Sequence, residues 1–230
     1  MAYSQQRVMR LPLTMINSYL SWNDAEDYIW ANRLVIIGAH ILNFCYGDDR
    51  TDDLGNGSQK SYTELVTMRN EWLSHRPSSF SPILISEPPD LAPTSSEKDP
   101  DILTRVWHTE DHHIVAAQTL GLLDILLAAY SPHIPRVGLS RKEEMERTDT
   151  RIKQIVLEIC GVAISNRQSP PAGLVACMAI NICADRFTER GVQWALMGVV
   201  RSTISESNYW PSRGFQRGLR GVWGWGCDEG

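Results

Sequence analysis

The sequence lacks the features of a secreted or cysteine-stabilised protein. Its first twenty residues contain no run of seven apolar residues, which a secretory signal requires, so we expect an intracellular protein. There are only five cysteines, they are widely spaced, and none forms a Cys-x-x-Cys pair, which argues against a structural zinc site and favours buried, reduced thiols. These cysteines are Cys45, Cys160, Cys177, Cys183 and Cys227.

Motifs for catalysis and nucleotide binding are absent as well. The chain contains no Gly-x-Ser-x-Gly, no Gly-x-Gly-x-x-Gly and no Gly-x-x-x-x-Gly-Lys-Ser/Thr. We therefore predict no catalytic, cofactor-binding or metal-binding residues, no cofactor and no enzyme activity. The net charge of -5 has the wrong sign for a domain that holds nucleic acid by its phosphates, so direct DNA binding is not expected.

What the chain does have is helical periodicity over most of its 230 residues. The predicted helices run from Asn23 to Gly47, Ser61 to about His75, Ile102 to Tyr130, Ser140 through Ala163, Ser169 to about Asp185, Thr188 to a break at Trp210-Pro211, and Phe215 to Trp223. No segment alternates like a strand bounded by hairpin turns. We predict an all-α fold, a single domain of about seven helices.

The expected boundaries follow from composition. An N-terminal extension covers residues 1–22, the helical domain covers 23–226, and a tail covers 227–230. Residues 77–101 hold half of the prolines, which remove backbone donors, so this segment should be extended or irregular. Capping boxes are predicted at Ser61/Glu64 and Ser140/Glu143, and Glu143 lies four residues before Arg147, the spacing of a helical ion pair.

Residues 114–130 are apolar on nearly every side of the predicted helix, which indicates a central, buried position. A membrane-spanning helix would need about 20 apolar residues. This run has about 17, includes Gln118 and Asp124, and ends before Pro132. No membrane association is expected.

The densest polar cluster is His108, His112 and His113 with Glu110 and Asp111. A continuous helix would place His108 and His112 on one face, as a zinc site could use. The His-Glu-x-x-His order of a zinc protease is missing, so we interpret the cluster as a polar helix entry.

Other charged groups also have a structural interpretation. Arg213, Arg217 and Arg220 lie at helical spacing beside Trp223 and Trp225, a pattern that can touch phosphate and bases. The acidic net charge instead favours a terminal amphipathic helix that docks its aromatic side on the core. Asp185-Arg186 and Glu189-Arg190 are interpreted as salt-bridged helix caps. Asp48, Asp49, Asp52 and Asp53 are interpreted as part of a solvated loop.

Several short sequence segments follow one another in a recognisable order. They are Trp72, Arg76-Pro77-x-x-Phe80-x-Pro82-Ile83, Trp107, His112, LLDILLAAYSPHIPRVG, Glu158-Ile159-Cys160-Gly161 through Asn166, PPAGLVACMAI, Asp185-Arg186-Phe187-Thr188-Glu189-Arg190, Trp210-Pro211, and Leu219 with Trp223-Gly224. Over roughly residues 25–226 the chain thereby resembles the C-terminal regulatory domain of fungal zinc binuclear cluster (Zn2Cys6) transcription factors.

This resemblance implies a nuclear regulator of transcription, controlling a metabolic or secondary-metabolite gene cluster. It implies contacts with a second copy of the chain, a full-length relative or the transcription machinery, and DNA contact only through them. The six cysteines that hold zinc in that family have no counterparts, because no cysteine precedes Cys45. Two alternatives remain: a helical module that senses a small metabolite between its helices, and a truncated or decayed regulator without independent activity.

Overall fold

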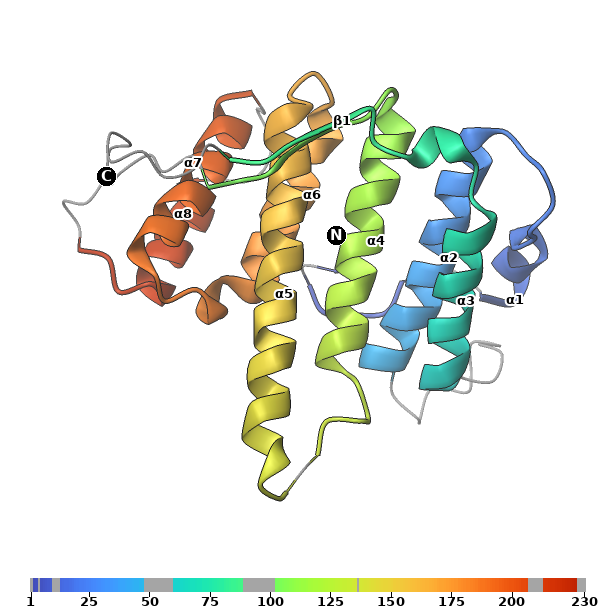
Figure 1. Cartoon of the computed structure of the whole chain (residues 1–230), viewed down its shortest axis with the longest axis horizontal. Helices are drawn as coiled ribbons and strands as arrows, with labels where there is room; N and C mark the ends of the chain where they lie inside the picture. The colour runs from blue at the N-terminus through green and yellow to red at the C-terminus, as the bar shows by residue number, and fades with distance from the viewer. Residues whose placement is uncertain are drawn as a thin grey trace.

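Helices form nearly all of the regular structure in the computed structural model, which describes residues 2–3, 5–9, 13–47, 60–88, 102–135, 137–206 and 213–226 (Figure 1). Seven helices of ten residues or more lie in this part: α2 (Asp27–Tyr46), α3 (Tyr62–His75), α4 (Asp111–Ala129), α5 (Ser140–Ser165), α6 (Pro170–Cys183), α7 (Arg190–Glu206) and α8 (Arg213–Val222). A four-residue helix, α1 (Leu13–Ile16), precedes them. The all-α prediction is confirmed.

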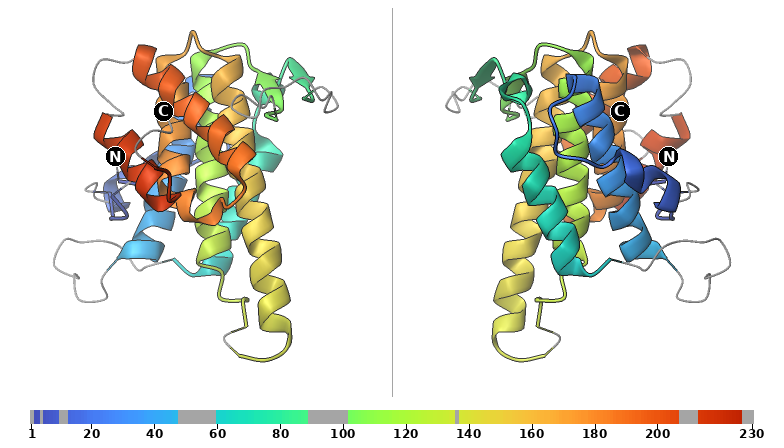
Figure 2. Two further views of the ribbon diagram at one scale, coloured as in Figure 1. Left: turned by 90° about the vertical axis from the view of Figure 1, so that its left-hand side faces the viewer. Right: turned by 90° about the vertical axis from the view of Figure 1, so that its right-hand side faces the viewer.

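Helix α4 lies at the centre of the arrangement, with α2 and α3 on one side and α5 and α6 on the other (Figures 1 and 2). Its side chains enter two hydrophobic clusters. Leu122 and Ile125 pack with residues of α5, α6 and α7, whereas Leu123 and Leu126 pack with residues of α2 and α3. By length and composition α4 is also apolar enough to cross a membrane, but neighbouring helices bury 56% of its most apolar window.

Two tryptophans define the cluster between α2, α3 and α4. Trp30 and Trp72 are both almost fully buried, and the indole N–H of Trp72 donates a hydrogen bond to the Trp30 carbonyl at 2.9 Å. Phe80 packs edge-on against Trp72, with ring centroids 5.5 Å apart. The end of α3 and the segment that follows it are thus fixed on α2.

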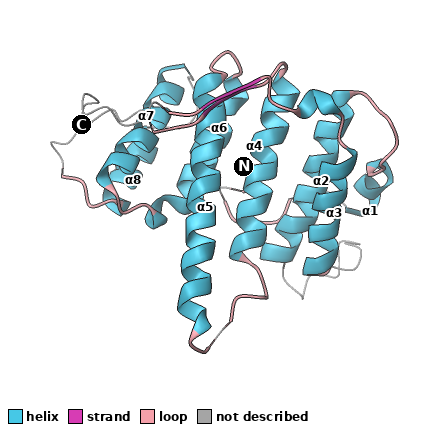
Figure 3. Ribbon diagram, in the orientation of Figure 1, coloured by secondary structure: helices cyan, strands magenta, loops and turns pink. Residues whose placement is uncertain are grey.

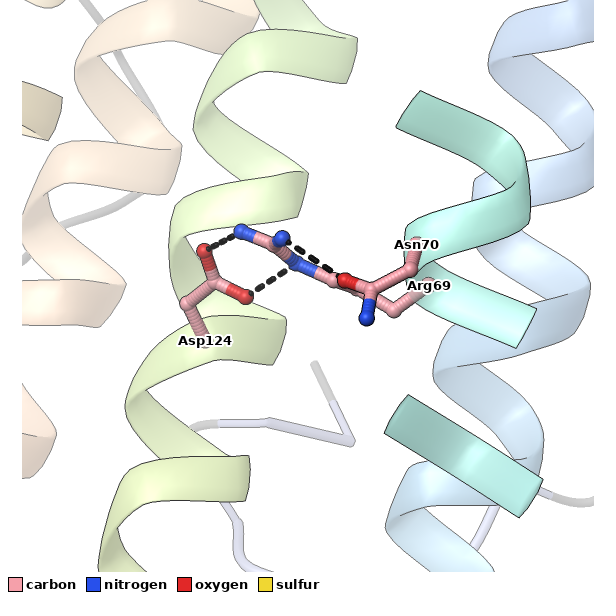
Figure 4. Close-up of polar contacts among 3 residues, drawn as sticks. All are labelled: Arg69, Asn70 and Asp124. Carbon is pink, nitrogen blue, oxygen red and sulfur yellow. Dashed lines mark hydrogen bonds and ion pairs between the residues drawn. The ribbon is translucent and has the colours of Figure 1, made fainter. Parts of the chain in front are cut away.

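A charged pair, Arg69 and Asp124, joins α3 to α4. Asp124 is the acidic residue that interrupts the apolar run of α4. The guanidinium of Arg69 donates through Nε to Asp124 Oδ1 at 2.8 Å and through Nη2 to Oδ2, while its Nη1 donates to Asn70 (Figure 4). Two parallel hydrogen bonds between a guanidinium and a carboxylate favour one relative orientation of their elements. Asp124 therefore fixes α3 along α4.

The predicted helix starts are confirmed at one capping box and wrong at the other. Ser61 and Glu64 form the reciprocal bonds of a capping box at α3. Ser140 caps nothing, because it already lies inside α5 and Leu139 holds the N-cap position. The chain turns at Gly138, whose φ is 108°, so helical geometry begins earlier than the box requires. The Glu143–Arg147 pair is present at 2.6 Å.

The prediction of a helix from Ile102 is wrong for its first nine residues, because α4 begins at Asp111. Arg105–Trp107 instead forms strand β2, which pairs antiparallel with β1 (Leu84–Ser86), with Ile85 opposite Val106. This two-stranded hairpin crosses over α5 (Figure 3). The segment predicted to be extended or irregular, residues 77–101, is described only as far as residue 88. Residues 77–88 contain β1 and a short 3-10 turn at Ser78–Phe80, and residues 89–101 lie outside the described part.

The side chains at the end of α5 explain why β2 is extended. In an antiparallel pair, alternate residues direct their backbone groups toward the partner strand. The Val106 N–H donates to Ser165 Oγ at 3.0 Å, and the Val106 carbonyl accepts from Asn166 Nδ2 at 2.8 Å. These long-range bonds replace the helical bonds that local periodicity favoured.

The two ends of the described chain pack on the helices. Leu13 is buried, and Asn17 Oδ1 lies 2.6 Å from His40 Nε2 of α2. At the other end, the indole N–H groups of Trp223 and Trp225 donate at 2.8 Å to Ala184 and Gln193. The predicted docking of a terminal amphipathic helix by its aromatic side is confirmed. The loop at residues 48–53, the break at 210–211 and the tail 227–230 lie outside the described residues.

Gly161 of α5 provides a test of how the hairpin is seated. A Cβ at this position would lie 1.9 Å from the Thr104 carbonyl oxygen, which is backbone and cannot rotate away. We expect Gly161→Ala to lower the free energy of unfolding by about 1–3 kcal/mol, the usual cost of overpacking. Gly198→Ala in α7, where nothing lies within 4 Å, should raise it by about 0.5–1 kcal/mol. Urea unfolding followed by circular dichroism measures both, and equal effects would contradict the seating described.

Candidate functional site

A groove of about 650 Å³ lies between α4, α5 and the hairpin. Ligand pockets in proteins commonly measure about 300–1,000 Å³ and are mainly apolar. Most of this lining is apolar and comes from all three elements: Ile85, Val106, Ala117, Leu120, Ile155, Ile159 and Val162. A hollow of about 740 Å³ along the first half of α5 is lined largely by charged side chains such as Arg141 and Lys142, as expected of a solvated helix face.

Gln118 is the most unusual residue of the groove, because its side chain is 0% exposed. Its amide nitrogen donates to the Ile159 carbonyl of α5 and the Ala172 carbonyl of α6, each at 3.0 Å. Two carbonyl acceptors require the NH₂ group on that side, which fixes the orientation of the amide. The amide oxygen then has no hydrogen-bond partner.

His108 contributes a second unpaired polar atom. The residue is 6% exposed, lines the same groove, and its Nδ1 has no hydrogen-bond partner. Burial, assisted by the neighbouring His113 and Arg76, lowers the pKa of His108 below its usual value of 6.5. The ring is therefore neutral near pH 7 and can donate or accept one hydrogen bond at each nitrogen, depending on the tautomer.

The roof of the groove is held by Asn166 and Ser165 at the end of α5. Asn166 is fully buried, and its amide nitrogen donates to the carbonyls of Val106 and Val162 while its oxygen accepts from the His108 N–H at 3.3 Å. Ser165 donates to the Gly161 carbonyl and accepts from Val106. All these polar groups are paired, whereas Gln118 and His108, which line the groove, each keep one buried polar atom without a partner.

The structure separates the histidines that periodicity placed on one helix face. His108 precedes α4, so it does not share a helix face with His112. Glu110 and Asp111 stand at the N-cap and the first position of α4, in agreement with the interpretation as a polar helix entry. His113 instead contacts Asp27 of α2 at 2.8 Å. Glu110 and Asp111 are exposed.

The other charged groups noted in the sequence are not brought together with these. Arg217 is exposed. The carboxylate partner of Arg186 is Asp149 of α5, at 2.8 Å, rather than a residue of its own turn.

The described cysteines are free, and three of them, Cys160, Cys177 and Cys183, are buried as predicted. Burial raises the pKa of Cys177 and of Cys183 to about 12. A thiol with so high a pKa is a poor nucleophile and a poor metal ligand at neutral pH. Cys227 lies outside the described residues.

Sequence reasoning noted Gln118 only as an interruption of an apolar run and did not identify Asn166 as an anchor. The available signal was a long amide inside a helix that must be buried on every side. Which of its atoms would lack a partner depends on α5 and α6, which the local sequence does not place.

In comparisons with known proteins, no family model matches the chain, and neither a curated protein nor a solved structure matches it.

Substitution of Gln118 tests whether its amide is needed for stability. The carbonyls that it contacts, Ile159 and Ala172, already accept the i+4 hydrogen bonds of their own helices. Gln118→Met keeps the volume and removes an unpaired oxygen, so we expect the free energy of unfolding to stay within about 1 kcal/mol or to rise. Asn166→Leu should lower it by at least about 2 kcal/mol, because it leaves buried backbone groups unpaired.

Chemical denaturation of both variants measures this contrast. A loss in Gln118→Met as large as that in Asn166→Leu would show that Gln118 is a structural residue like Asn166.

Proposed function

We propose that this protein is a ligand-responsive regulatory module: it binds a small organic molecule in the groove between α4, α5 and the hairpin, and it acts through contacts with other proteins. One observation carries the proposal. The otherwise largely apolar groove is lined by two buried side chains, Gln118 and His108, that each hold a polar atom without a partner.

The energetic argument concerns these unpaired atoms. A buried polar group without a hydrogen bond costs about 1–3 kcal/mol, and most buried side-chain polar atoms in folded proteins are paired. A bound molecule that offers a donor to Gln118 Oε1 would remove this cost. Ligand sites are mainly apolar pockets in which a few polar groups provide specificity, and the groove has this composition.

The lining also indicates the chemical class of the ligand. Gln118 Oε1 can only accept, so the ligand should carry a hydroxyl or N–H donor on an apolar body. Among the charged residues of the lining, the acidic Glu87 and Glu158 outnumber Arg76. A strongly anionic ligand is therefore disfavoured, and an apolar compound that carries a hydroxyl or N–H donor suits the lining.

The hairpin provides a route from the groove to a partner. Ile85 lines the groove and is 58% exposed, and its neighbours Ile83 and Leu84 are exposed as well. Exposed apolar side chains that lie together favour protein contacts. We call Ile83, Leu84 and Ile85 the hairpin edge, and we propose that groove occupancy alters the position of this edge and so its affinity for a partner.

The resemblance to fungal zinc-cluster regulators supports placing this module in transcription. Arg76, Phe80 and Pro82, three of the residues that carry the resemblance, line the groove. On this proposal the protein works in the nucleus, regulates a metabolic or secondary-metabolite gene cluster, and reaches DNA only through a full-length relative, a second copy or the transcription machinery.

Ligand binding can be tested by thermal unfolding with a panel of phenols, naphthols and hydroxylated polyketide-like aromatics. A ligand at 100 times its dissociation constant stabilises the folded state by about 2.7 kcal/mol, so a true ligand raises the melting temperature. Gln118→Met should abolish that rise, whereas Gln193→Met, which alters a buried amide beside Trp225 and away from the groove, should keep it. No rise with any compound, or an equal loss in both variants, would contradict the proposed site.

Partner binding can be tested by co-expressing two differently tagged copies, and separately this chain with a full-length relative. The proposal predicts a mixed complex that co-purifies and elutes as one species on size exclusion. Leu84→Lys on the hairpin edge should abolish it, whereas Leu139→Lys, an exposed leucine near the start of α5, should not. Separate monomer peaks in both pairings would contradict action through these partners.

A further inference from the structure

A cluster of metal-ligand side chains lies apart from the groove lining, where the N-terminal ends of α2 and α4 meet. Asp27 is the first residue of α2, and His112 and His113 lie in the first turn of α4. One ligand-type atom from each of the three side chains lies within 4.8 Å of the other two. The three residues are 85 or more positions apart across the two helices, so only the fold brings them together.

The buried nitrogens of the cluster are the second observation. His113 is 3% exposed, and its Nε2 lies 2.8 Å from Asp27 Oδ2. The His112 ring packs against the His113 ring at 4.2 Å, and His112 Nε2 is buried without a hydrogen-bond partner. Phe80 covers the pair, with its centroid 4.7 Å from that of His113. A buried imidazole nitrogen without a partner, in a cluster that also holds a carboxylate, requires an explanation, and a bound ion provides one.

We infer that Asp27, His112 and His113 bind a divalent transition-metal ion of the zinc class. Two imidazole nitrogens and one carboxylate oxygen are ligands that zinc and cobalt accept, whereas magnesium and calcium prefer sets of oxygens. Bonds of 2.0–2.2 Å in a tetrahedron place ligand atoms roughly 3.4 Å apart. The Asp27–His113 contact would lengthen slightly, and the widest separations in the cluster would close by a little over 1 Å.

The surroundings of Asp27 suit this role. The Ser79 side chain hydrogen-bonds to the Asp27 carboxylate, and this bond is the main cause of a lowered pKa at Asp27. Residues that hydrogen-bond a metal ligand orient it and tune the site. Three protein ligands leave a fourth tetrahedral position for water or another small ligand.

Metal binding does not require a ligand in the groove, although the two regions adjoin through Phe80, which lines the groove and packs against His113. None of the three residues lines the groove. The site would tie the start of α2 to the start of α4, so its first effect is to strengthen the contact between these helices. A failure to bind metal leaves the groove proposal intact, and the reverse also holds.

The test uses the full chain without a polyhistidine tag, treated with a chelator and then titrated with Co²⁺ alone. Tetrahedral Co²⁺ gives visible absorption bands of a strength that octahedral, water-bound Co²⁺ lacks. We expect one equivalent to bind with such bands, and Zn²⁺ to displace it. His112→Gln should weaken binding at least about 100-fold, because removing even a second-shell partner of a ligand commonly costs 10–100-fold.

The matched control is His133→Gln, which changes an exposed histidine that contacts Tyr62 and should bind Co²⁺ like the unaltered protein. Asp27→Asn keeps the shape of the side chain but removes the carboxylate, and it should also lose the bands. This second variant guards against a loss caused by misfolding of His112→Gln. Circular dichroism checks that each variant is helical. The absence of bands in the unaltered protein, or an equal loss in His133→Gln and His112→Gln, would overturn the assignment.

Discussion

The structure depends on one constraint: α4 is apolar on nearly every side and packs against helices on two opposite sides. Helices α2 and α3 bury one part of its surface and α5, α6 and α7 another, so α4 belongs to both hydrophobic clusters. A helix in this position cannot carry polar groups without partners nearby. Asp124 meets this requirement through Arg69 of α3, and Gln118 meets half of it through the carbonyls of α5 and α6.

The unpaired amide oxygen of Gln118 is the main reason to regard this groove as the candidate site. Gln118 lines a groove that the hairpin covers. The hairpin rests on α5 through Ser165 and Asn166, and the absence of a side chain at Gly161 lets Thr104 approach closely. The side chains that hold the hairpin on α5 are thus paired, whereas Gln118 and His108 in the groove lining each keep an unpaired polar atom. The same α4 begins with the histidines that meet Asp27, so the two proposed sites are separate but share one helix.

Much of the fold follows from the sequence, because helix periodicity and capping are local. The seven helices, the box at Ser61 and the buried thiols required no knowledge of tertiary structure. One error has a tertiary cause: the sequence of residues 102–110 favours a helix, but Ser165 and Asn166 at the end of α5 hydrogen-bond to Val106 and hold it in a strand. The other is local: the turn at Gly138 places Ser140 inside α5, with Leu139 at the N-cap. The candidate site was harder to predict from the sequence, because His108 and Gln118 line one groove only once the hairpin is placed against α4 and α5. The pairing of His113 with Asp27 spans 86 residues and has no local signal.

The central claim is that Gln118 presents a carbonyl oxygen to a ligand. Crystallographic screening with small fragments that carry hydroxyl or N–H donors tests this most directly, because it locates each bound atom. The account predicts that fragments gather in the groove between α4, α5 and the hairpin, with a donor within hydrogen-bonding distance of Gln118 Oε1. A groove that stays empty in crystals whose other surfaces bind fragments, or an amide oxygen found paired with the protein itself, would contradict it.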